Sequence, residues 1–299
     1  MLPEFPQFKK LEVSDKTDIE AVTGDYPPYS DFNFTSMWSW NIKGEMEVSC
    51  AGKNLVMKFT DYVTGKPFYS FLGTEKPSET ASALLQHSVR EGLKPMMKLL
   101  PEISVKQIDH TLFAIKEDPD NFDYVLSVEK IKHYQGSAYE KKRNDVRRFT
   151  KRHQFRVEVL DVRLQNIHHK ILESFHAWME EKDITVSEAQ NELAALKRFF
   201  LISANLDLVT VAIFSGNTII AFWITEVVGN GYAISHFEKA HSSFAGVYAY
   251  LKQQTASALS ERGIEYVNLE QDLGISGLRA NKESYYPHEY LKKFSLTSL

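Results

Sequence analysis

The alternation of apolar and polar positions is clearest in the second half of the chain. Three runs there are rich in β-branched and aromatic residues and are separated by turns of glycine and asparagine, which is typical of successive antiparallel strands. We expect these strands at residues 207–214, 218–228 and 232–238. Apolar residues then recur at helical spacing over about 245–262, Gly263 closes this helix, and 264–269 reads as another strand. Two more helices are expected before this block, at about 164–182 and 187–203.

The first half shows a fainter copy of the same order. Strands are expected at 45–50, 54–59 and 67–71, a helix at about 78–91, and a further strand at 94–99. Residues 118–121 combine aspartate, proline and asparagine and indicate a break in the chain. We therefore predict an α+β fold of two tandem domains, residues 1–125 and 126–299, each with a mixed, mostly antiparallel sheet flanked by helices. The step from strand through helix to strand should give a parallel pair in each domain.

Composition sets limits on what the chain does. Of its 299 residues 43% are hydrophobic and 25% charged, which is typical of a globular protein. The formal net charge of -4 means that any anion site must come from local clustering. Cys50 is the only cysteine, so an intrachain disulfide is excluded. The first residues lack the apolar core of a signal peptide, and no run approaches about 18 apolar residues, so we expect a cytoplasmic protein.

The most basic stretch is GSAYEKKRNDVRRFTKRH, residues 136–153. It is expected to form a helix with Ser137 as its N-cap and with a narrow apolar face. The candidates for binding phosphate, including that of RNA, are Lys141, Lys142, Arg143, Asn144, Arg147 and Arg148. The alternative is a solvated face that acidic neighbours neutralise.

A second candidate lies where the strand ending near residue 238 leads into the next helix. His236 and Glu238 alternate with Phe237, so we expect both to project from one face of the strand. Such a pair could act as general base and partner in catalysis. The alternative is a structural histidine that forms a hydrogen bond.

The third candidate is NLEQDLGISGLRANKESYYP, residues 268–287, which follows the last strand of the second domain. Ligands of α/β sheets favour the carboxyl ends of parallel strands. Asp272 is a candidate catalytic residue, and the candidate substrate-binding residues are Asn268, Glu270, Arg279, Lys282 and Tyr285. Arg279 and Lys282 are three residues apart on a short predicted helix and should share a face. The alternative is an ion pair of Arg279 with Asp272 or Glu270 that only shapes the turn.

Several common catalytic motifs are absent from the sequence. It has no HExxH zinc motif, no Walker loop, no GxSxG nucleophile elbow and no GxGxxG dinucleotide loop. His168 and His169 have no companion cluster, so no metal site and no bound cofactor is expected.

Three segments carry a resemblance to a known family. YPPYSDFNFTSMWSW near the N-terminus, YQGSAYEKKRNDVRRF in the middle and VNLEQDLGISGLRANKESYYP near the C-terminus resemble the phosphatidylglycerol lysyltransferase C-terminal-like family of stand-alone bacterial proteins. The resemblance implies two tandem GNAT-like units and a relationship to the Fem-type aminoacyltransferases. Such enzymes carry an amino acid from an aminoacyl-tRNA to an amine or to a lipid hydroxyl. It therefore implies a transferase with aminoacyl-tRNA and a small-molecule or lipid acceptor as partners.

The chain departs from the GNAT acetyltransferases at their acyl-CoA loop, whose pattern is Q/R-x-x-G-x-G/A. The matching stretch is residues 241–246, where His241 stands first and Phe244 replaces the middle glycine. A bulky residue there should crowd a pyrophosphate, so aminoacyl-tRNA is the expected donor. An acyl-CoA-dependent N-acyltransferase is the first alternative, and a non-catalytic module that binds RNA or an anion is the second.

Overall fold

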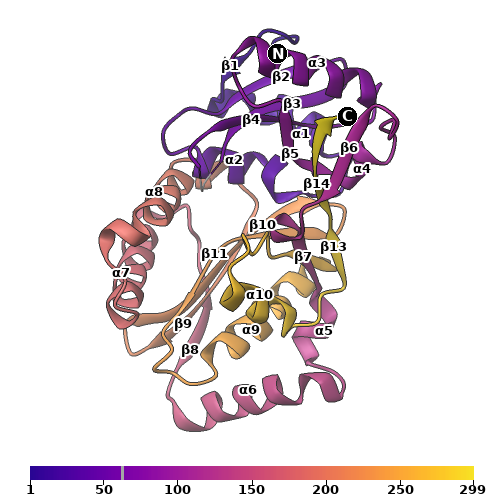
Figure 1. Ribbon diagram of the computed structural model, residues 1–299. Helices are drawn as coiled ribbons and strands as arrows, with labels where there is room; N and C mark the ends of the chain where they lie inside the picture. The colour runs from indigo at the N-terminus through magenta and orange to yellow at the C-terminus, as the bar shows by residue number, and fades with distance from the viewer. Residues whose placement is uncertain (62–63) are drawn as a thin grey trace. The chain divides into compact units, whose positions relative to one another are not determined.

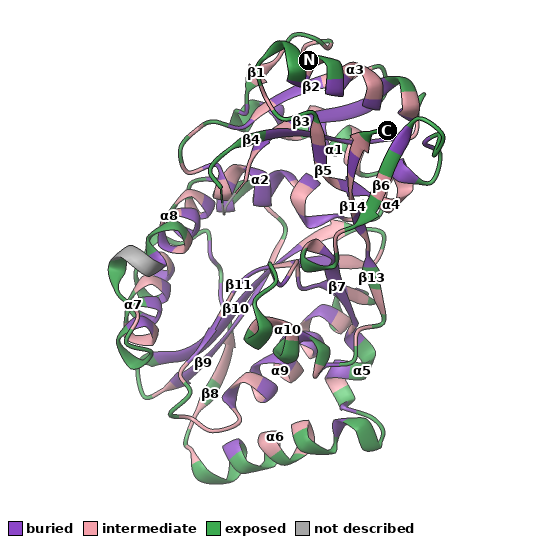
Figure 2. Cartoon of the chain, viewed as in Figure 1, coloured by how far each residue is buried: buried purple, intermediate pink, exposed green. Residues whose placement is uncertain are grey.

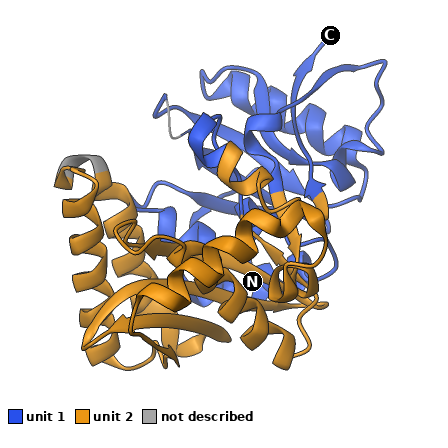
Figure 3. Ribbon diagram, turned by 90° about the horizontal axis from the view of Figure 1, so that it is seen from below, with its two compact units in different colours: residues 1–123, 270–279, 290–299 blue, residues 124–269, 280–289 orange. Residues whose placement is uncertain are grey.

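The computed structural model describes residues 1–61 and 64–299, without the side chains of 187 and 188. The chain forms two compact units. Unit 1 comprises residues 1–123, 270–279 and 290–299, and unit 2 comprises 124–269 and 280–289 (Figure 3). The predicted boundary near residue 125 differs from this division at the C-terminal end, because two late segments join the first unit.

Unit 1 is built on a seven-stranded sheet with the order β1-β2-β3-β4-β5-β14-β6 (Figure 1). The strands are β1 Lys9–Lys10, β2 Glu47–Ala51, β3 Asn54–Thr60, β4 Pro67–Leu72, β5 Met96–Pro101, β6 Phe113–Glu117 and β14 Lys293–Ser298. Its helices are α1 Lys16–Thr23, α2 Phe34–Trp40, α3 Pro77–Arg90 and α4 Glu102–Val105, with 3-10 turns at Val13–Asp15, Ser30–Phe32 and Pro119–Asn121. β4 and β5 pair in parallel across α3, and the other neighbours are antiparallel.

Unit 2 contains a second seven-stranded sheet, with the order β13-β7-β12-β11-β10-β9-β8. The strands are β7 Asp123–Ser127, β8 Arg156–Val159, β9 Leu208–Ser215, β10 Thr218–Gly229, β11 Tyr232–Ala240, β12 Tyr266–Asn268 and β13 Glu289–Leu291. The helices are α5 Val128–His133, α6 Glu140–Arg152, α7 Gln165–Glu181, α8 Val186–Ile202, α9 Val247–Glu261 and α10 Ser276–Glu283, with 3-10 turns at Ser137–Tyr139 and Ser203–Asn205.

The helices of unit 2 cover its sheet. α7 packs on β10 and β11, while α9 packs on β9 and β10 and is itself covered by α5 and α6. Strands and the inner faces of these helices are buried, whereas α6 is mostly exposed (Figure 2). Buried Phe149 anchors α6 to the core.

The predicted α+β class and the order of elements are confirmed. The two expected parallel pairs are β4 with β5 and β11 with β12. α9 ends as predicted, because Gly263 N–H donates to Ser260 and Ile264 N–H to Leu259, the Schellman arrangement that a glycine with positive φ permits. The prediction of Ser137 as N-cap is wrong, since Ser137 lies inside a 3-10 turn and α6 begins three residues later.

Candidate functional site

The alternation of β11 predicts a shared face for His236 and Glu238, but the register of the strand shifts between them. Phe237 pairs with Ile224 and Ser235 with Thr225, so His236 is the extra residue of a β-bulge. The bulge reverses the alternation. The Nε2 of His236 donates to Glu226 at 2.9 Å, and its ring packs on Phe199 of α8. Glu238 instead accepts from Lys252 of α9 at 2.6 Å. These contacts give the two side chains different partners, and the contact of His236 with Glu226 agrees with the alternative of a hydrogen-bonded structural histidine.

A cluster of lysines and aromatic rings surrounds the predicted residue Tyr285 inside unit 2. The Nζ of Lys252 lies 5.1 Å from the ring centroid of Tyr285 and 4.1 Å from that of Trp223. The Nζ of Lys142 lies 3.5 Å from the Tyr285 centroid and donates to Ser284. Burial lowers the pKa of Lys142 to about 8, and the positive charge of Lys252 acts in the same direction. Lys142 therefore belongs to this cluster more than to the exposed basic face.

The other predicted phosphate-binding residues of α6 divide into two groups. Arg143 donates to the carbonyls of Tyr134 and Gly136 and so ties down the chain before the helix. The exposed residues are Lys141, Asn144, Arg147 and Arg148 and, beyond the predicted set, Lys151 and Arg152. Arg148 is paired with Asp145. The acidic neighbours thus neutralise only part of this face, which keeps several cations on the surface.

The predicted site of residues 268–287 contains a turn held by ion pairs. Arg279 contacts Asp272 through Nε at 2.8 Å and Nη2 at 2.9 Å, and it also donates to Asp120 at 2.6 Å. Asp272 is fully buried. Within unit 2, Lys282 is buried and donates to the carbonyl of Leu269 at 2.6 Å, while Asn268 is fully buried on β12. These contacts match the ion-pair alternative.

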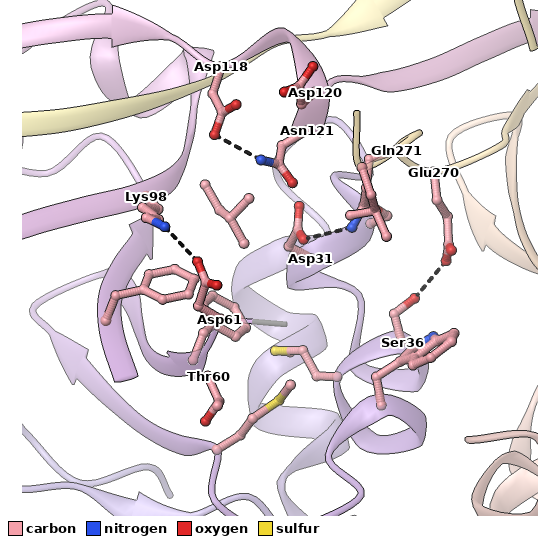
Figure 4. Close-up of a pocket in the computed structure, with 18 of the residues that line it drawn as sticks. Asp31, Ser36, Thr60, Asp61, Lys98, Asp118, Asp120, Asn121, Glu270 and Gln271 are labelled. Atoms are coloured by element: carbon pink, nitrogen blue, oxygen red, sulfur yellow. Dashed lines mark hydrogen bonds and ion pairs between the residues drawn. The ribbon is translucent and has the colours of Figure 1, made fainter. Parts of the chain in front are cut away.

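Glu270 and Gln271, by contrast, line a cavity of about 540 Å³ within unit 1 (Figure 4). The polar groups that line it are Ser30, Asp31, Ser36, Thr60, Asp61, Thr64, Lys98, Asp118, Asp120, Asn121, Glu270 and Gln271. The apolar groups are Met37, Trp40, Met46, Phe59, Phe68, Leu99 and Leu273. A concave site with an apolar wall and a few convergent polar groups is the usual form of a small-molecule site.

Asp31 belongs to a buried charge network at this cavity. Lys293 of β14, which is fully buried, pairs with both Asp31 and Asp123. Asp123 also accepts from the backbone N–H of Ser30 at 2.8 Å and from its hydroxyl at 2.7 Å. Burial raises the pKa of Asp31 to about 6; Lys293 opposes this shift, and the negative charges of Asp123 and Glu270 add to it.

Further polar contacts connect residues that line the cavity. Lys98 donates to Asp61 at 2.5 Å. Burial opposes ionisation of Asp61, but hydrogen bonds from Lys98 and Thr64 outweigh it and lower the pKa of Asp61 to about 2. Ser36 donates to Glu270 at 3.2 Å.

Three lining residues have a backbone conformation that side chains other than glycine rarely adopt. The φ angles are 56° at Leu99, 59° at Glu270 and 56° at Leu273. Such strain costs about 1–3 kcal/mol per residue and concentrates at functional sites. The lining of the cavity thus includes backbone conformations that cost free energy.

Neither a metal-binding cluster nor a membrane-spanning helix is found among the described residues. Across residues 1–61 and 64–299, no group of three or more histidine, cysteine, aspartate or glutamate side chains is arranged to hold a metal ion. In the same residues, no helix combines the length and the apolar character that crossing a membrane requires.

Comparison with known proteins places the chain in a family. Residues 24–297 match the model of the family described as phosphatidylglycerol lysyltransferase, C-terminal. The chain belongs to this family.

Several solved structures have the same fold as this member of the phosphatidylglycerol lysyltransferase C-terminal family. A conserved protein of unknown function from Bacteroides thetaiotaomicron is 24% identical, with a TM-score of 0.85 over 100% of both chains. The L-PGS structure from Bacillus licheniformis is 12% identical, with a TM-score of 0.63 over 99% of this chain and 93% of that one. FemX is 10% identical, with a TM-score of 0.59 over 97% of this chain and 96% of that one. No curated protein matches. The fold is two GNAT-like units, and the family supports an aminoacyltransferase-type function.

In this family member the loop that corresponds to the acyl-CoA loop of GNAT acetyltransferases, residues 241–246, is bound by a side chain of the protein itself. Glu181 accepts from the backbone N–H groups of Ser242 and Ser243 at 3.0 and 2.6 Å and from the Ser242 hydroxyl at 2.8 Å. Burial disfavours the charge of Glu181, but these hydrogen bonds prevail and lower the pKa of its carboxyl. Phe244, which was expected to crowd a pyrophosphate, packs on His153 with ring centroids 5.0 Å apart.

The carboxylate at the centre of the cavity was missed by the sequence analysis. Asp31 lies in the segment 26–40 that resembles the family, and Ser30, Ser36, Met37 and Trp40 of the same segment also line the cavity. A compact segment with one aspartate, three serines and six aromatic residues was the available signal. Its partners Lys293 and Asp123 could not be paired with it by local pattern.

Proposed function

We propose that the chain moves an aminoacyl group from an aminoacyl-tRNA to an amine or hydroxyl group of a small-molecule or lipid acceptor. The acceptor nitrogen or oxygen attacks the ester carbonyl, the bond between that carbon and the ribose oxygen breaks, and the released tRNA hydroxyl takes up the acceptor's proton. With this donor, the reaction belongs in the bacterial cytoplasm.

The observation that carries the proposal is the basic face of α6. Lys141, Arg147, Lys151 and Arg152 are exposed on a helix that buried Phe149 fixes to the core. The chain as a whole is acidic, with a formal net charge of -4. The electrostatic free energy of binding a phosphate backbone should therefore be most favourable at this local excess of cations. Membership of the lysyltransferase family supports the transfer of an aminoacyl group.

The acyl-CoA alternative is disfavoured by Glu181. A pyrophosphate at the loop 241–246 would have to displace a carboxylate that holds two backbone N–H groups of that loop. The incoming phosphates would otherwise meet the negative charge of this carboxylate in the same place. We therefore rank aminoacyl-tRNA above acyl-CoA.

Transfer is tested by supplying the purified protein with tRNA charged with isotope-labelled amino acids and with extracts of bacterial small molecules and lipids. We expect mass spectrometry to find the label on an acceptor, and only when the tRNA is charged. A parallel reaction receives acetyl-CoA. Acetylated product, or thermal stabilisation by CoA approaching the roughly 2.7 kcal/mol expected at 100 times its dissociation constant, would promote the acyl-CoA alternative. Binding of tRNA without any product would indicate the non-catalytic module.

A further inference from the structure

Lys142 of α6 carries a half-buried amine that has no carboxylate partner. Its Nζ donates to the hydroxyl of Ser284 at 2.8 Å and lies 3.5 Å from the centroid of the Tyr285 ring. Among the described residues, no aspartate or glutamate forms an ion pair with this nitrogen. Lys252 of the same cluster, by contrast, pairs with Glu238 at 2.6 Å. Lys142 has therefore lost part of its hydration without gaining a counter-ion.

The charges around Lys142 do not supply the missing partner. The charged groups that face it from α6, β11 and α9 are Lys141, Asp145, Glu238 and Lys252. Both carboxylates are already engaged, because Asp145 accepts from Arg148 and Glu238 accepts from Lys252. Burial lowers the pKa of Lys142 to about 8, and the positive charge of Lys252 is the second cause. These surroundings favour the neutral amine over the ammonium group.

A neutral amine is a nucleophile, whereas an ammonium group is not. With a pKa of about 8, roughly a quarter of Lys142 is neutral at pH 7.5. An ordinary lysine, with a pKa of about 10.4, is neutral to only about 0.1% at this pH. A less basic amine is intrinsically a weaker nucleophile, which offsets part of this roughly 200-fold difference. Lys142 should still react faster than an ordinary exposed lysine.

The helix that carries Lys142 also attracts the molecules that transport activated acyl groups. Lys141, Arg147 and Lys151 are exposed on α6. Acyl phosphates, acyl-CoA thioesters and aminoacyl-tRNA esters all join an electrophilic carbonyl carbon to a phosphate-bearing carrier. Exposed cations raise the local concentration of such carriers. The reactive carbonyl is thereby brought close to the amine of Lys142.

We propose that Lys142 is an acylation site of this chain and accepts an acyl group from an activated, phosphate-bearing donor. The neutral Nζ attacks the carbonyl carbon, an amide bond forms, and the bond from that carbon to the oxygen or sulfur of the carrier breaks. The carrier leaves with the electron pair of that bond, and the amine releases one proton to the solvent. The inference goes beyond the proposed function, because the acceptor is the chain itself. Only the case of an aminoacyl-tRNA donor rests on that function.

Competitive labelling of the folded protein tests the amine itself. Each lysine reacts with a trace of isotope-labelled acetic anhydride, and fragment-ion mass spectrometry separates Lys142 from Lys141. We expect the labelling rate of Lys142 to level off above about pH 8. The rates of exposed lysines should instead rise about tenfold per pH unit up to pH 9.5, as for a lysine with a pKa of about 10.4.

This titration measures the balance of forces on Lys142 directly, including the attraction of the Tyr285 ring for an ammonium group. Unfolding in guanidinium chloride is the control and should make the profiles of Lys142 and Lys141 the same. A rate for Lys142 that follows that of Lys141 up to pH 9.5 in the folded protein would overturn the proposal.

The natural carriers are then compared at pH 7.5 without any added acceptor. Acetyl phosphate, acetyl-CoA and tRNA charged with a labelled amino acid represent the three classes of donor. We expect at least one of them to modify Lys142 at least fivefold faster than Lys141, its neighbour on the same helix, and the carrier that does so identifies the donor. Selective modification by none of the three would refute the inference. Transfer to an external acceptor without modification of Lys142 would uphold the proposed function and refute this inference alone.

Variants test whether the missing counter-ion makes Lys142 reactive. Ser284→Asp places a carboxylate where the hydroxyl now accepts from Nζ. It should move the pH at which labelling levels off upward by about one unit or more, because an adjacent negative charge favours the ammonium form. Asn217→Asp is the matched control, since it adds the same charge in the exposed turn between β9 and β10 of unit 2 and should leave the profile unchanged. An unchanged profile in Ser284→Asp, or the same shift in both variants, would contradict the assignment.

Discussion

One extra residue in β11 decides what two candidate catalytic groups can do. Strict alternation would place His236 and Glu238 on the same face, but the bulge at His236 gives them different partners, Glu226 and Lys252. A candidate pair that rests on alternation is only as good as the register of its strand. Contacts of single residues, rather than residue types, therefore decide which carboxylates and lysines in this chain are available to a ligand.

The close packing of α6 likewise depends on a single residue, Gly246. It has a φ of +96°, and a Cβ atom there would lie 2.1 Å from the carbonyl oxygen of Asp145 on α6. Gly136 has a φ of +94° and no atom within 4 Å of its Cβ position. Its ψ of 169° places it in a region that essentially only glycine adopts, so we expect Gly136→Ala to lower the free energy of unfolding by about 1–3 kcal/mol, the cost of the backbone conformation alone. Gly246→Ala should lower it by at least about 2 kcal/mol more.

Denaturant unfolding of the two alanine variants measures this difference. The backbone conformation of Gly136, with a ψ of 169°, is at least as costly for alanine as that of Gly246, with a ψ of -3°. A larger loss of stability in the Gly246 variant therefore reports the close approach of α6 to the loop before α9. Equal losses of stability would show that α6 does not lie this close to the loop in solution.

At the scale of elements, α6 combines a structural and a surface role. Phe149 and Arg143 fix the helix, while the exposed cations contribute little to folding, since surface charges stabilise by only about 0–1 kcal/mol per pair. The proposed function assigns these exposed cations to a partner with negative charge. The helix is thus the element in which the proposed function can be tested without unfolding the protein.

We expect the double variant Arg147→Ala with Lys151→Ala to bind tRNA more weakly and with a shallower salt dependence. If each side chain contacts one phosphate, the slope of log affinity against log salt should fall by roughly 1.4–1.8. Arg163→Ala with Arg262→Ala removes the same charge from exposed arginines that pair with Asp161 and Asp207 outside α6. A change of slope that is the same in both double variants would refute a specific role of the α6 face.

At the scale of the whole molecule, the C-terminal strand β14 completes the sheet that the N-terminal residues form. β14 lies between β5 and β6 in unit 1, and it contributes the fully buried residues Lys293 and Leu296. The domain that the linear order suggests is therefore incomplete, because residues 1–123 lack one inner strand of their own sheet.

Removal of residues 292–299 should leave unit 1 unable to form its native sheet. The truncation exposes the edges of β5 and β6 and deletes Lys293, which pairs with Asp31 and Asp123. Hydrogen exchange should then show loss of amide protection in β5 and β6. Deletion of Leu299 alone, which lies beyond β14, is the control and should leave that protection unchanged. Retained protection in the longer truncation would mean that β14 is dispensable.

The sequence by itself determined the order of helices and strands, the two parallel crossovers, the family and the basic surface helix. These features depend on local periodicity, on turn residues such as Gly263, and on contiguous motifs. Only the tertiary structure decided which face His236 occupies, that Arg279 is engaged by Asp272 and Asp120, and that segments near residues 31, 61, 98, 120 and 270 form one cavity. There are two physical reasons. A bulge shifts the alternation of a strand without a sequence signature. The pairing of Asp31 with Lys293 joins residues from opposite ends of the chain, and no local pattern reports contacts over such a distance.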